Sequence, residues 1–152
     1  MGITLQNLSD LQSLLAADSQ LILTNGCFDI LHVGHVRYLA QARALGTHLL
    51  VAVNSDASVR QLKGHTRPIN RDTDRAEILN ALACVDFTFV FAEQTAESVI
   101  YGARPAIYAK GGDYSLDTLP EKPAIEAVGC KVALLNYHKG FSTTSLIDCI
   151  IK

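Results

Sequence analysis

The chain has 152 residues, of which 49% are hydrophobic and 18% charged, so it can form a hydrophobic core and is not intrinsically disordered. We expect one domain over residues 1–152. Its formal net charge of −2 gives no broad basic surface, which argues against nucleic acid as a partner. The four cysteines form no C-x-x-C pair, so neither a zinc ribbon nor a thioredoxin-like motif is indicated.

The N-terminal segment has leucines at positions 5, 8, 11, 14 and 15, a spacing that predicts an amphipathic helix within residues 1–18. This spacing differs from the continuous apolar run of a signal peptide. No apolar run reaches the length of a transmembrane helix. We therefore expect a cytoplasmic protein with no membrane partner, whose core occupies residues 20–152.

Short β-rich runs alternate with helical patterns along the rest of the chain. The runs predict five strands, at 21–24, 48–54, 86–91, 106–110 and 131–136. The patterns between them predict helices at roughly 35–45, 72–84, 94–103, 121–128 and 143–151. Strands that are apolar on both faces favour a parallel sheet covered by helices on both sides. The expected fold class is therefore α/β, a doubly wound three-layer domain with a five-stranded parallel sheet.

Two predicted connections, 62–72 and 111–123, are longer than their neighbours. Loops at the carboxyl ends of parallel strands carry the ligand site in folds of this class, so we expect function there. The first loop begins a basic concentration formed by Lys63, Arg67, Arg71 and Arg75. These side chains fit either ordinary surface charge or a mobile loop that closes over a polyphosphate.

The segment "NGCFDILHVGH" at 25–35 follows the first predicted strand. Asn25-Gly26 signals a turn, and Gly34 stands at the start of the next helix, where free amides and the helix dipole suit a phosphate. His32 and His35 would add imidazole donors. The same pattern also fits a simple helix cap, or a metal site for which zinc would need ligands beyond Cys27. The segment alone leaves these three interpretations open.

Two more segments have a ligand-binding and a purely structural interpretation. "KGGDY" at 110–114 follows a predicted strand and fits a plain turn as well as a backbone wrapped around a ligand. In "GFSTTSLI" at 140–147, the hydroxyl side chains open the last helix as N-caps or as phosphate ligands. Asp56 follows a strand end and either contacts a substrate or caps a helix. Because these segments share one edge of the predicted sheet, the phosphate interpretation gains weight for all of them.

Several of these segments resemble the signatures of a known family. "HVGH" at 32–35 resembles the H-x-G-H signature of the small nucleotidyltransferase superfamily, and "STT" at 142–144 resembles its second signature. The ordered blocks "TNGCFD", "VAVNSD", "LKG…RPIN", "KGGDY" and "GFSTT" are most similar to the adenylyltransferase domain of heptose 1-phosphate adenylyltransferases. The resemblance covers almost all of residues 20–152. It implies a Rossmann-like fold and transfer of AMP from ATP to a sugar 1-phosphate, giving an ADP-sugar and pyrophosphate.

Glycerol-3-phosphate cytidylyltransferases are the nearest alternative. Enzymes of that branch read RYVD where this chain has "ACVD" at 83–86, and RTEGISTT where it has "YHKGFSTT" at 137–144. Both cationic positions of that branch are therefore missing here. Transfer of CMP from CTP to an alcohol phosphate remains the second hypothesis. A non-catalytic nucleotide-binding module is the third.

The resemblance also implies roles for individual residues. His32 and His35 would donate hydrogen bonds to the α-phosphate, and Lys63 would reach the phosphates from the mobile loop. The acceptor would contact Asp56 and Arg67. Mg²⁺ is expected on the triphosphate without a protein metal site, and the chain is expected to form a homodimer. Nucleotide contacts are implied for Asn25, Gly26, Cys27, Phe28, Asp29, Gly34, Arg75, Lys110, Gly111, Gly112, Asp113, Tyr114, Ser142, Thr143 and Thr144.

Overall fold

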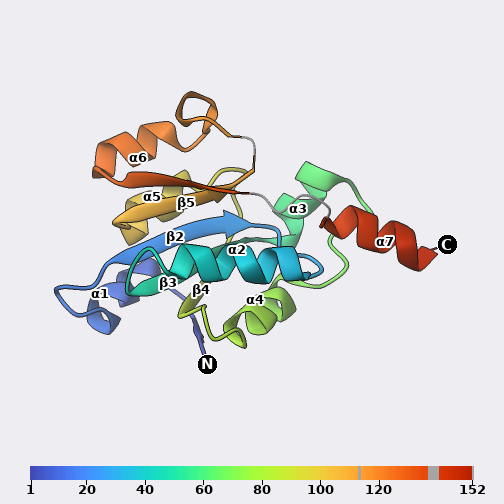
Figure 1. The fold of residues 1–152 in the computed structure, drawn as a ribbon, viewed down its shortest axis with the longest axis horizontal. Helices are drawn as coiled ribbons and strands as arrows, with labels where there is room; N and C mark the ends of the chain where they lie inside the picture. The colour runs from blue at the N-terminus through green and yellow to red at the C-terminus, as the bar shows by residue number, and fades with distance from the viewer. Residues whose placement is uncertain (113, 137–140, 152) are drawn as a thin grey trace.

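Parallel strands form one continuous sheet in the computed structural model, which describes residues 1–112, 114–136 and 141–151 (Figure 1). Their spatial order is β1–β4–β3–β2–β5–β6, and every neighbouring pair runs parallel. This confirms the predicted α/β class with a parallel sheet. The six strands are β1 (Ile3–Thr4), β2 (Leu21–Gly26), β3 (His48–Asn54), β4 (Phe87–Phe91), β5 (Ile107–Gly111) and β6 (Lys131–Leu135).

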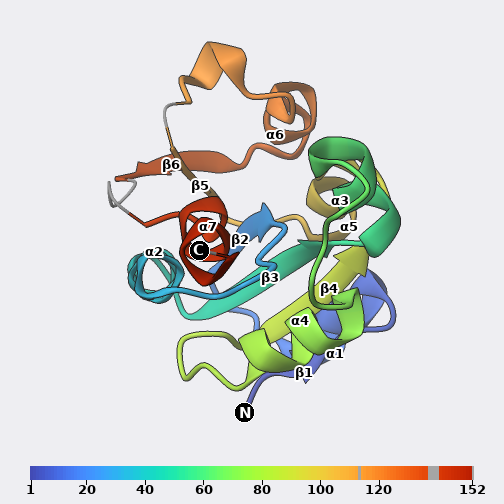
Figure 2. The same ribbon diagram turned by 90° about the vertical axis from the view of Figure 1, so that its right-hand side faces the viewer.

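Helices cover both faces of the sheet, so the molecule has the predicted three layers (Figure 2). Helices α1, α5 and α6 lie on one face, and α2 and α4 on the other. No helix in the described part of the chain is long and apolar enough to cross a membrane. The α-helices are α1 (Leu11–Leu14), α2 (Val33–Arg43), α3 (Asp56–Lys63), α4 (Asp72–Asn80), α5 (Glu97–Ala103), α6 (Lys122–Val128) and α7 (Thr143–Ile151).

Alternate residues of the central strand β3 pack into two separate cores. Leu50 and Ala52 join the cluster beneath α5 and α6. Leu49, Val51 and Val53 join the cluster beneath α2 and α4. All five side chains are fully buried, which is why the strand is an unbroken apolar run in the sequence.

The predicted N-terminal helix at 1–18 is wrong for most of its length. Residues Ile3–Thr4 form an edge strand beside β4, and only Leu11–Leu14 is α-helical. The N–H groups of Gly2 and Leu5 donate to the carbonyls of Asn80 and Thr88, both at 2.8 Å. Satisfying the exposed edge of β4 outweighs the helical spacing of the leucines. The sheet consequently has six strands rather than the five predicted.

Helix α3 was not among the predicted helices. The Ser55 hydroxyl accepts a hydrogen bond from the Ser58 N–H at 3.2 Å and caps its first turn. Only Ser58 and Val59 of its eight residues are buried, so the helix carries too few apolar positions to be recognised by periodicity. As a result Lys63 is the last residue of a helix rather than part of the adjoining loop.

Strand β2 is the point at which the strand order reverses. It pairs with β3 on one side and with β5 on the other, although β3 and β4 lie between β2 and β5 in the chain. The connections that leave β2 and β5 therefore diverge to opposite faces of the sheet. A crevice between such connections is the usual ligand site of an open parallel sheet.

Candidate active site

A cavity of about 530 Å³ lies at the carboxyl ends of β2 and β5. It is of the size that binds small-molecule ligands. Many residues predicted from the sequence line it together: Asn25, Gly26, Cys27, Phe28, Asp29, His32, Gly34, His35, Lys63, Arg67, Lys110, Gly111, Tyr114 and Thr143. The cavity lining does not include Asp56, Arg75, Gly112, Ser142 or Thr144. Asp113 falls outside the residues that the structure describes.

The two histidines cap α2 through one nitrogen each. The His35 N–H donates to His32 Nδ1 at 3.3 Å, and the His32 N–H donates to His35 Nδ1 at 3.4 Å. Their rings stack with centroids 3.8 Å apart. Because each Nδ1 accepts a hydrogen bond, each neutral ring carries its proton on Nε2. The capping and the ligand-binding interpretations are therefore compatible, since capping leaves the Nε2–H donors for a ligand.

Burial keeps both imidazoles neutral. It lowers the pKa of His35 to about 4, with smaller contributions from the neighbouring His32 and Lys63. It also lowers the pKa of His32 below its ordinary value. The Nε2 atom of His32 is buried and has no hydrogen-bond partner among the described residues. The pair is therefore a set of neutral donors at physiological pH.

Gly34 is required by close packing between the histidines and the C-terminal segment. A Cβ at this position would lie 2.9 Å from His32 Nδ1 and 3.0 Å from the Cβ of Phe141. Any side chain would displace the ring that caps the helix. The glycine of the H-x-G-H pattern thus fixes the geometry of the two histidines.

The Asp29 carboxylate fastens the basic loop to the loop after β2. It accepts hydrogen bonds from the N–H groups of Ile69 at 2.8 Å and Asn70 at 2.9 Å, and from Arg67 Nε at 2.6 Å. Burial alone would raise the pKa of Asp29, but these hydrogen bonds lower it below the ordinary value. Arg67 Nη2 remains buried without a partner among the described residues. Asp29 thereby positions Arg67 at the cavity wall.

Arg75 lies behind the cavity and holds its loops together. Its fully buried guanidinium donates to the carbonyl oxygens of Cys27, Asn54 and Asn70, which belong to the loop after β2, the end of β3 and the loop before α4. It also donates to the Asp56 carboxylate at 2.9 Å. These two side chains form an internal ion pair outside the cavity lining, and the contacts expected of Asp56 with the acceptor and of Arg75 with the nucleotide stay predictions. Their position gives both residues a supporting role.

The start of α7 brings one hydroxyl residue to the cavity. Thr143 lines it and donates to the Ile30 carbonyl at 3.2 Å, which joins α7 to the loop before α2. The Ser142 hydroxyl accepts from the Ser145 N–H at 3.0 Å, so Ser142 acts as the helix cap. Thr144 is exposed and lies away from the lining. The "STT" block therefore contributes one lining side chain and one cap.

A polar network joins the ends of β2 and β5. Lys110 Nζ donates to Asn25 Oδ1 at 3.0 Å and to the Tyr108 hydroxyl at 3.2 Å, and lies 3.6 Å from Glu121 Oε1. Burial lowers the pKa of Lys110, while the charge of Glu121 opposes that change. Lys110 is thus held inside a network rather than extended toward a ligand.

The cavity is also lined by residues that were not predicted as site residues from the sequence: Tyr38, Asn54, Leu62, Gln94, Thr95, Pro120, Glu121, Asn136 and Phe141. Gln94 and Thr95 follow β4, and Glu121 precedes α6. Glu121 lies in the long connection 111–123 that was expected to carry function, yet nothing in its local sequence distinguishes it from an exposed glutamate. Its burial depends on the packing of α5 and α6 and has no local signal.

Comparison with known proteins gives consistent matches. The cytidylyltransferase-like family model matches residues 23–146. The bifunctional protein HldE of Geobacter sulfurreducens is 45% identical over 151 residues, which are 97% of this chain and 31% of that protein. HldE of Proteus mirabilis is 47% identical over 133 residues, or 88% of this chain and 28% of that protein. The chain therefore spans less than a third of the length of these relatives.

Solved structures share the fold. A lipopolysaccharide core biosynthesis protein from Thermoplasma volcanium has a TM-score of 0.66 and 28% identity, covering 81% of this chain and 99% of that chain. A pantoate-beta-alanine ligase from Francisella tularensis, solved with an ATP compound and beta-alanine, has a TM-score of 0.67 and 11% identity, covering 98% of this chain and 77% of that chain. At that identity the second similarity concerns the fold alone.

Proposed function

This chain belongs to the cytidylyltransferase-like family, and we propose that it transfers AMP from ATP to a sugar 1-phosphate. The products would be an ADP-sugar and pyrophosphate. The similarity to HldE proteins and the sequence blocks of heptose 1-phosphate adenylyltransferases support a heptose 1-phosphate as the acceptor. Cytidylyl transfer to an alcohol phosphate is the alternative reaction.

One observation carries the proposal: two buried donors that lack partners among the described residues line the same cavity. They are His32 Nε2 and Arg67 Nη2, and Lys63 lies on the same lining. A buried donor without an acceptor costs about 1–3 kcal/mol, which a ligand rich in acceptor oxygens would recover. Phosphate oxygens meet that requirement, and neutral histidines can donate to them without a change of protonation.

The proposed chemistry needs alignment more than proton transfer. The acceptor phosphate is ionised near neutral pH, so one of its oxygens can attack the α-phosphorus directly. The new P–O bond forms as the bond to the pyrophosphate oxygen breaks. His32 and His35 would donate from Nε2 to the α-phosphate oxygens, while Lys63 and Arg67 offset the charge that develops. Thr143, which lines the cavity, would contact the remaining phosphates.

We propose that ATP enters as its magnesium complex, with the ion held mainly by phosphate oxygens. Within the described ranges, no group of three His, Cys, Asp or Glu side chains could hold a metal ion. The Asp29 carboxylate, which lines the cavity, is already occupied by the loop at 67–70. A homodimer and a cytoplasmic location, both expected from the sequence, remain part of the proposal.

The test is a matrix of nucleotides and acceptors read by pyrophosphate release. ATP, CTP, GTP and UTP would each be combined with heptose 1-phosphate, mannose 1-phosphate and glycerol 3-phosphate. We expect ATP with a sugar 1-phosphate to give the fastest release. If CTP outperforms ATP with every acceptor, the adenylyl assignment is wrong and the cytidylyltransferase alternative is favoured.

The variant His35→Ala separates catalysis from a pure binding module in the same assay. Removing one donor to the α-phosphate should slow release about 100-fold or more while ATP binding is largely retained. The matched control is His65→Ala, which alters an exposed histidine of the basic loop. Turnover that survives the loss of His35 would remove the proposed role of the histidine pair.

A further inference from the structure

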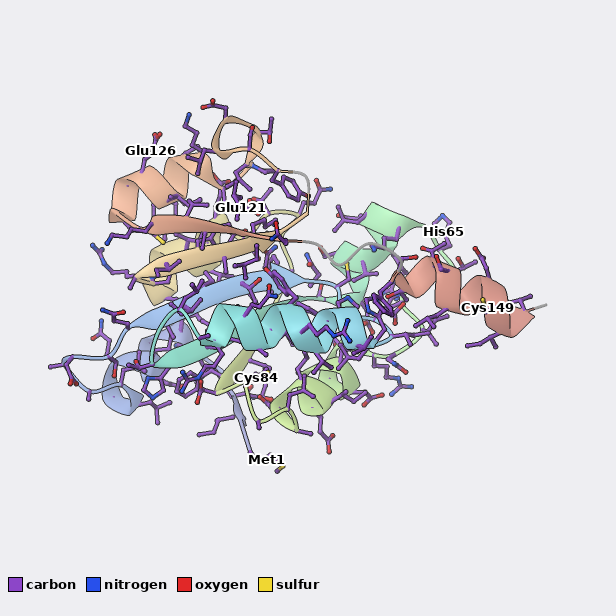
Figure 3. All side chains as sticks on the ribbon, viewed as in Figure 1. Met1, His65, Cys84, Glu121, Glu126 and Cys149 are labelled. Atoms are coloured by element: carbon purple, nitrogen blue, oxygen red, sulfur yellow. The ribbon has the colours of Figure 1, made fainter. Side chains whose placement is uncertain are left out.

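Glu121 is a buried carboxylate on the side of the cavity formed by α5 and α6. It is 2% exposed, although it directly precedes the short surface helix α6. Figure 3 shows Glu121 between α6 and the sheet, whereas Glu126 of the same helix points away from the molecule. The side chain of Glu126 is 67% exposed. The fold therefore places one of two neighbouring glutamates against the cavity.

One oxygen of Glu121 is occupied. Its Oε1 accepts a hydrogen bond from the Ala96 N–H at 3.3 Å and lies 3.6 Å from Lys110 Nζ. The Oε2 atom is buried and has no hydrogen-bond partner among the described residues. A buried carboxylate oxygen without a donor is unfavourable, so a ligand that donates to it would bind with a corresponding gain.

The neighbouring donors are already used. The single hydrogen of the Tyr108 hydroxyl is donated to Asn25 Oδ1 at 2.6 Å. Lys110 directs its ammonium group toward Asn25, Tyr108 and Glu121 Oε1. None of these contacts reaches Oε2. The protein network therefore does not supply the missing donor from these side chains.

The chemistry of an unpaired carboxylate oxygen selects the ligand group. An ionised carboxylate only accepts hydrogen bonds, and it repels phosphate. His32 and His35, the proposed hydrogen-bond donors to phosphate, lie on the α2 side of the sheet. Glu121 lies on the α5 and α6 side. A substrate that spans the cavity would present its phosphates to the first side and an uncharged donor to the second.

We propose that Glu121 Oε2 accepts a hydrogen bond from a hydroxyl group of a bound substrate. Glu121 is then a specificity-determining residue for a polyhydroxylated ligand. The assignment of that ligand rests on the proposed function, in which both the acceptor sugar and the ribose of ATP carry hydroxyl groups. Lys110 and the Ala96 N–H hold the carboxylate in position by occupying Oε1.

The experiment compares ligands that differ by one hydroxyl, using binding as well as turnover. Calorimetry would measure the Kd values of ATP, 2′-deoxyATP and 3′-deoxyATP for the protein. A second series would measure the Kd values of mannose 1-phosphate and its monodeoxy analogues, in the presence of a non-hydrolysable ATP analogue. The proteins are the unaltered chain, Glu121→Gln and the control Glu126→Gln. Pyrophosphate release is recorded for the same pairs.

For the unaltered chain and for Glu126→Gln, we expect the Kd of one deoxy analogue to be about 10-fold higher than the Kd of its parent ligand. A loss of this size is typical of a hydrogen bond to a charged group. In Glu121→Gln this ratio should fall to about 2 or less. The series in which the effect occurs, nucleotide or sugar, identifies the hydroxyl. Absence of pyrophosphate release with intact discrimination would contradict the proposed function but not the subsite.

Two results would overturn the subsite. One is a Glu121→Gln variant that keeps the ratios of the unaltered chain in both series. The other is an unaltered chain that discriminates against no deoxy analogue, which decides the matter even if Glu121→Gln fails to fold. Thermal unfolding of each variant would establish whether it is folded.

Discussion

At the scale of single residues, the histidine pair shows how one side chain serves structure and chemistry together. Nδ1 of each ring satisfies a backbone N–H at the start of α2. The same contacts leave Nε2 outside the helix cap and favour the tautomer that donates from it, in two residues that line the cavity. A substitution here would change both the helix terminus and the ligand site, so stability and activity must be measured separately.

The half-buried His35 predicts a specific pH dependence of stability. Because burial lowers its pKa to about 4, the unfolded chain binds more protons than the folded one between this value and the ordinary 6.5. The free energy of unfolding should therefore decrease as the pH falls from about 6.5 to about 4. His32, whose pKa is also lowered, acts in the same direction. The pKa of Asp29 is lowered as well, and its contribution to stability is lost only as the pH falls below the ordinary value of 3.8.

Denaturant unfolding at several pH values would test this expectation. His35→Asn should flatten the decrease, because Asn does not titrate and its amide oxygen can accept the His32 N–H in place of Nδ1. The exposed His65, replaced in the same way, should leave the pH profile unchanged. An unaltered slope in His35→Asn, or an equal flattening in His65→Asn, would contradict the assignment of the slope to His35.

At the scale of elements, the loop between α3 and α4 is fixed by two buried charges. Asp29 binds the backbone of Ile69 and Asn70, and Arg75 binds the carbonyl of Asn70 from the other side. The C-terminal half of this loop is therefore attached to the rest of the protein, and the mobility expected from the sequence can apply only to its N-terminal half. Lys63, at the end of α3, is the cation closest in sequence to the unattached part.

Removing the carboxylate should release this loop. Asp29→Ala leaves Arg67 and two backbone N–H groups unpaired, so we expect a loss of about 3–5 kcal/mol in the free energy of unfolding. Hydrogen exchange at Ile69 and Asn70 should become faster, as mass spectrometry would show. Asp117→Ala is the control, because it breaks an ion pair of an 87% exposed side chain with Lys122. Unchanged exchange at 69–70 in Asp29→Ala would disprove the attachment.

At the scale of the whole molecule, the cavity joins the two layers of helices across the sheet. Its lining combines the start of α2 and α7 with the end of α3 and the residues before α5 and α6. Helix α7 has no buried residues, and Ile150 and Ile151 at its end are 77% and 76% exposed. A ligand that contacts both sides of the cavity would therefore connect elements that make few contacts of their own.

We expect ATP with Mg²⁺ to stabilise the fold by mass action. A ligand at about 100 times its Kd adds about 2.7 kcal/mol if it binds only the folded state. Thermal unfolding would show this as a rise in Tm, and EDTA should reduce the rise by weakening nucleotide binding. Without nucleotide, EDTA should leave Tm unchanged. A lower Tm in that control would indicate a resident metal ion and contradict a metal carried by the nucleotide.

Much of the fold follows from the sequence because its signals are local. Strands such as 48–54 are apolar on both faces, and this pattern predicts burial in a parallel sheet without knowledge of any partner. The spacing of His32, Gly34 and His35 at a strand-to-helix junction likewise fixes a helix N-terminus with donors on it. Each of these features depends on residues within about one turn or one strand of each other.

The tertiary structure decided what depends on distant partners. Strand β1 exists because β4 offers an open edge, and α3 because Val59 finds a buried position. Arg75 lies behind the cavity and donates to the Cys27 carbonyl, 48 positions earlier in the chain. Glu121 lies at the cavity and accepts from the Ala96 N–H, 25 positions earlier. A charged residue has the same local sequence whether solvent or a buried partner satisfies it, so only the packed fold determines which charges face the ligand.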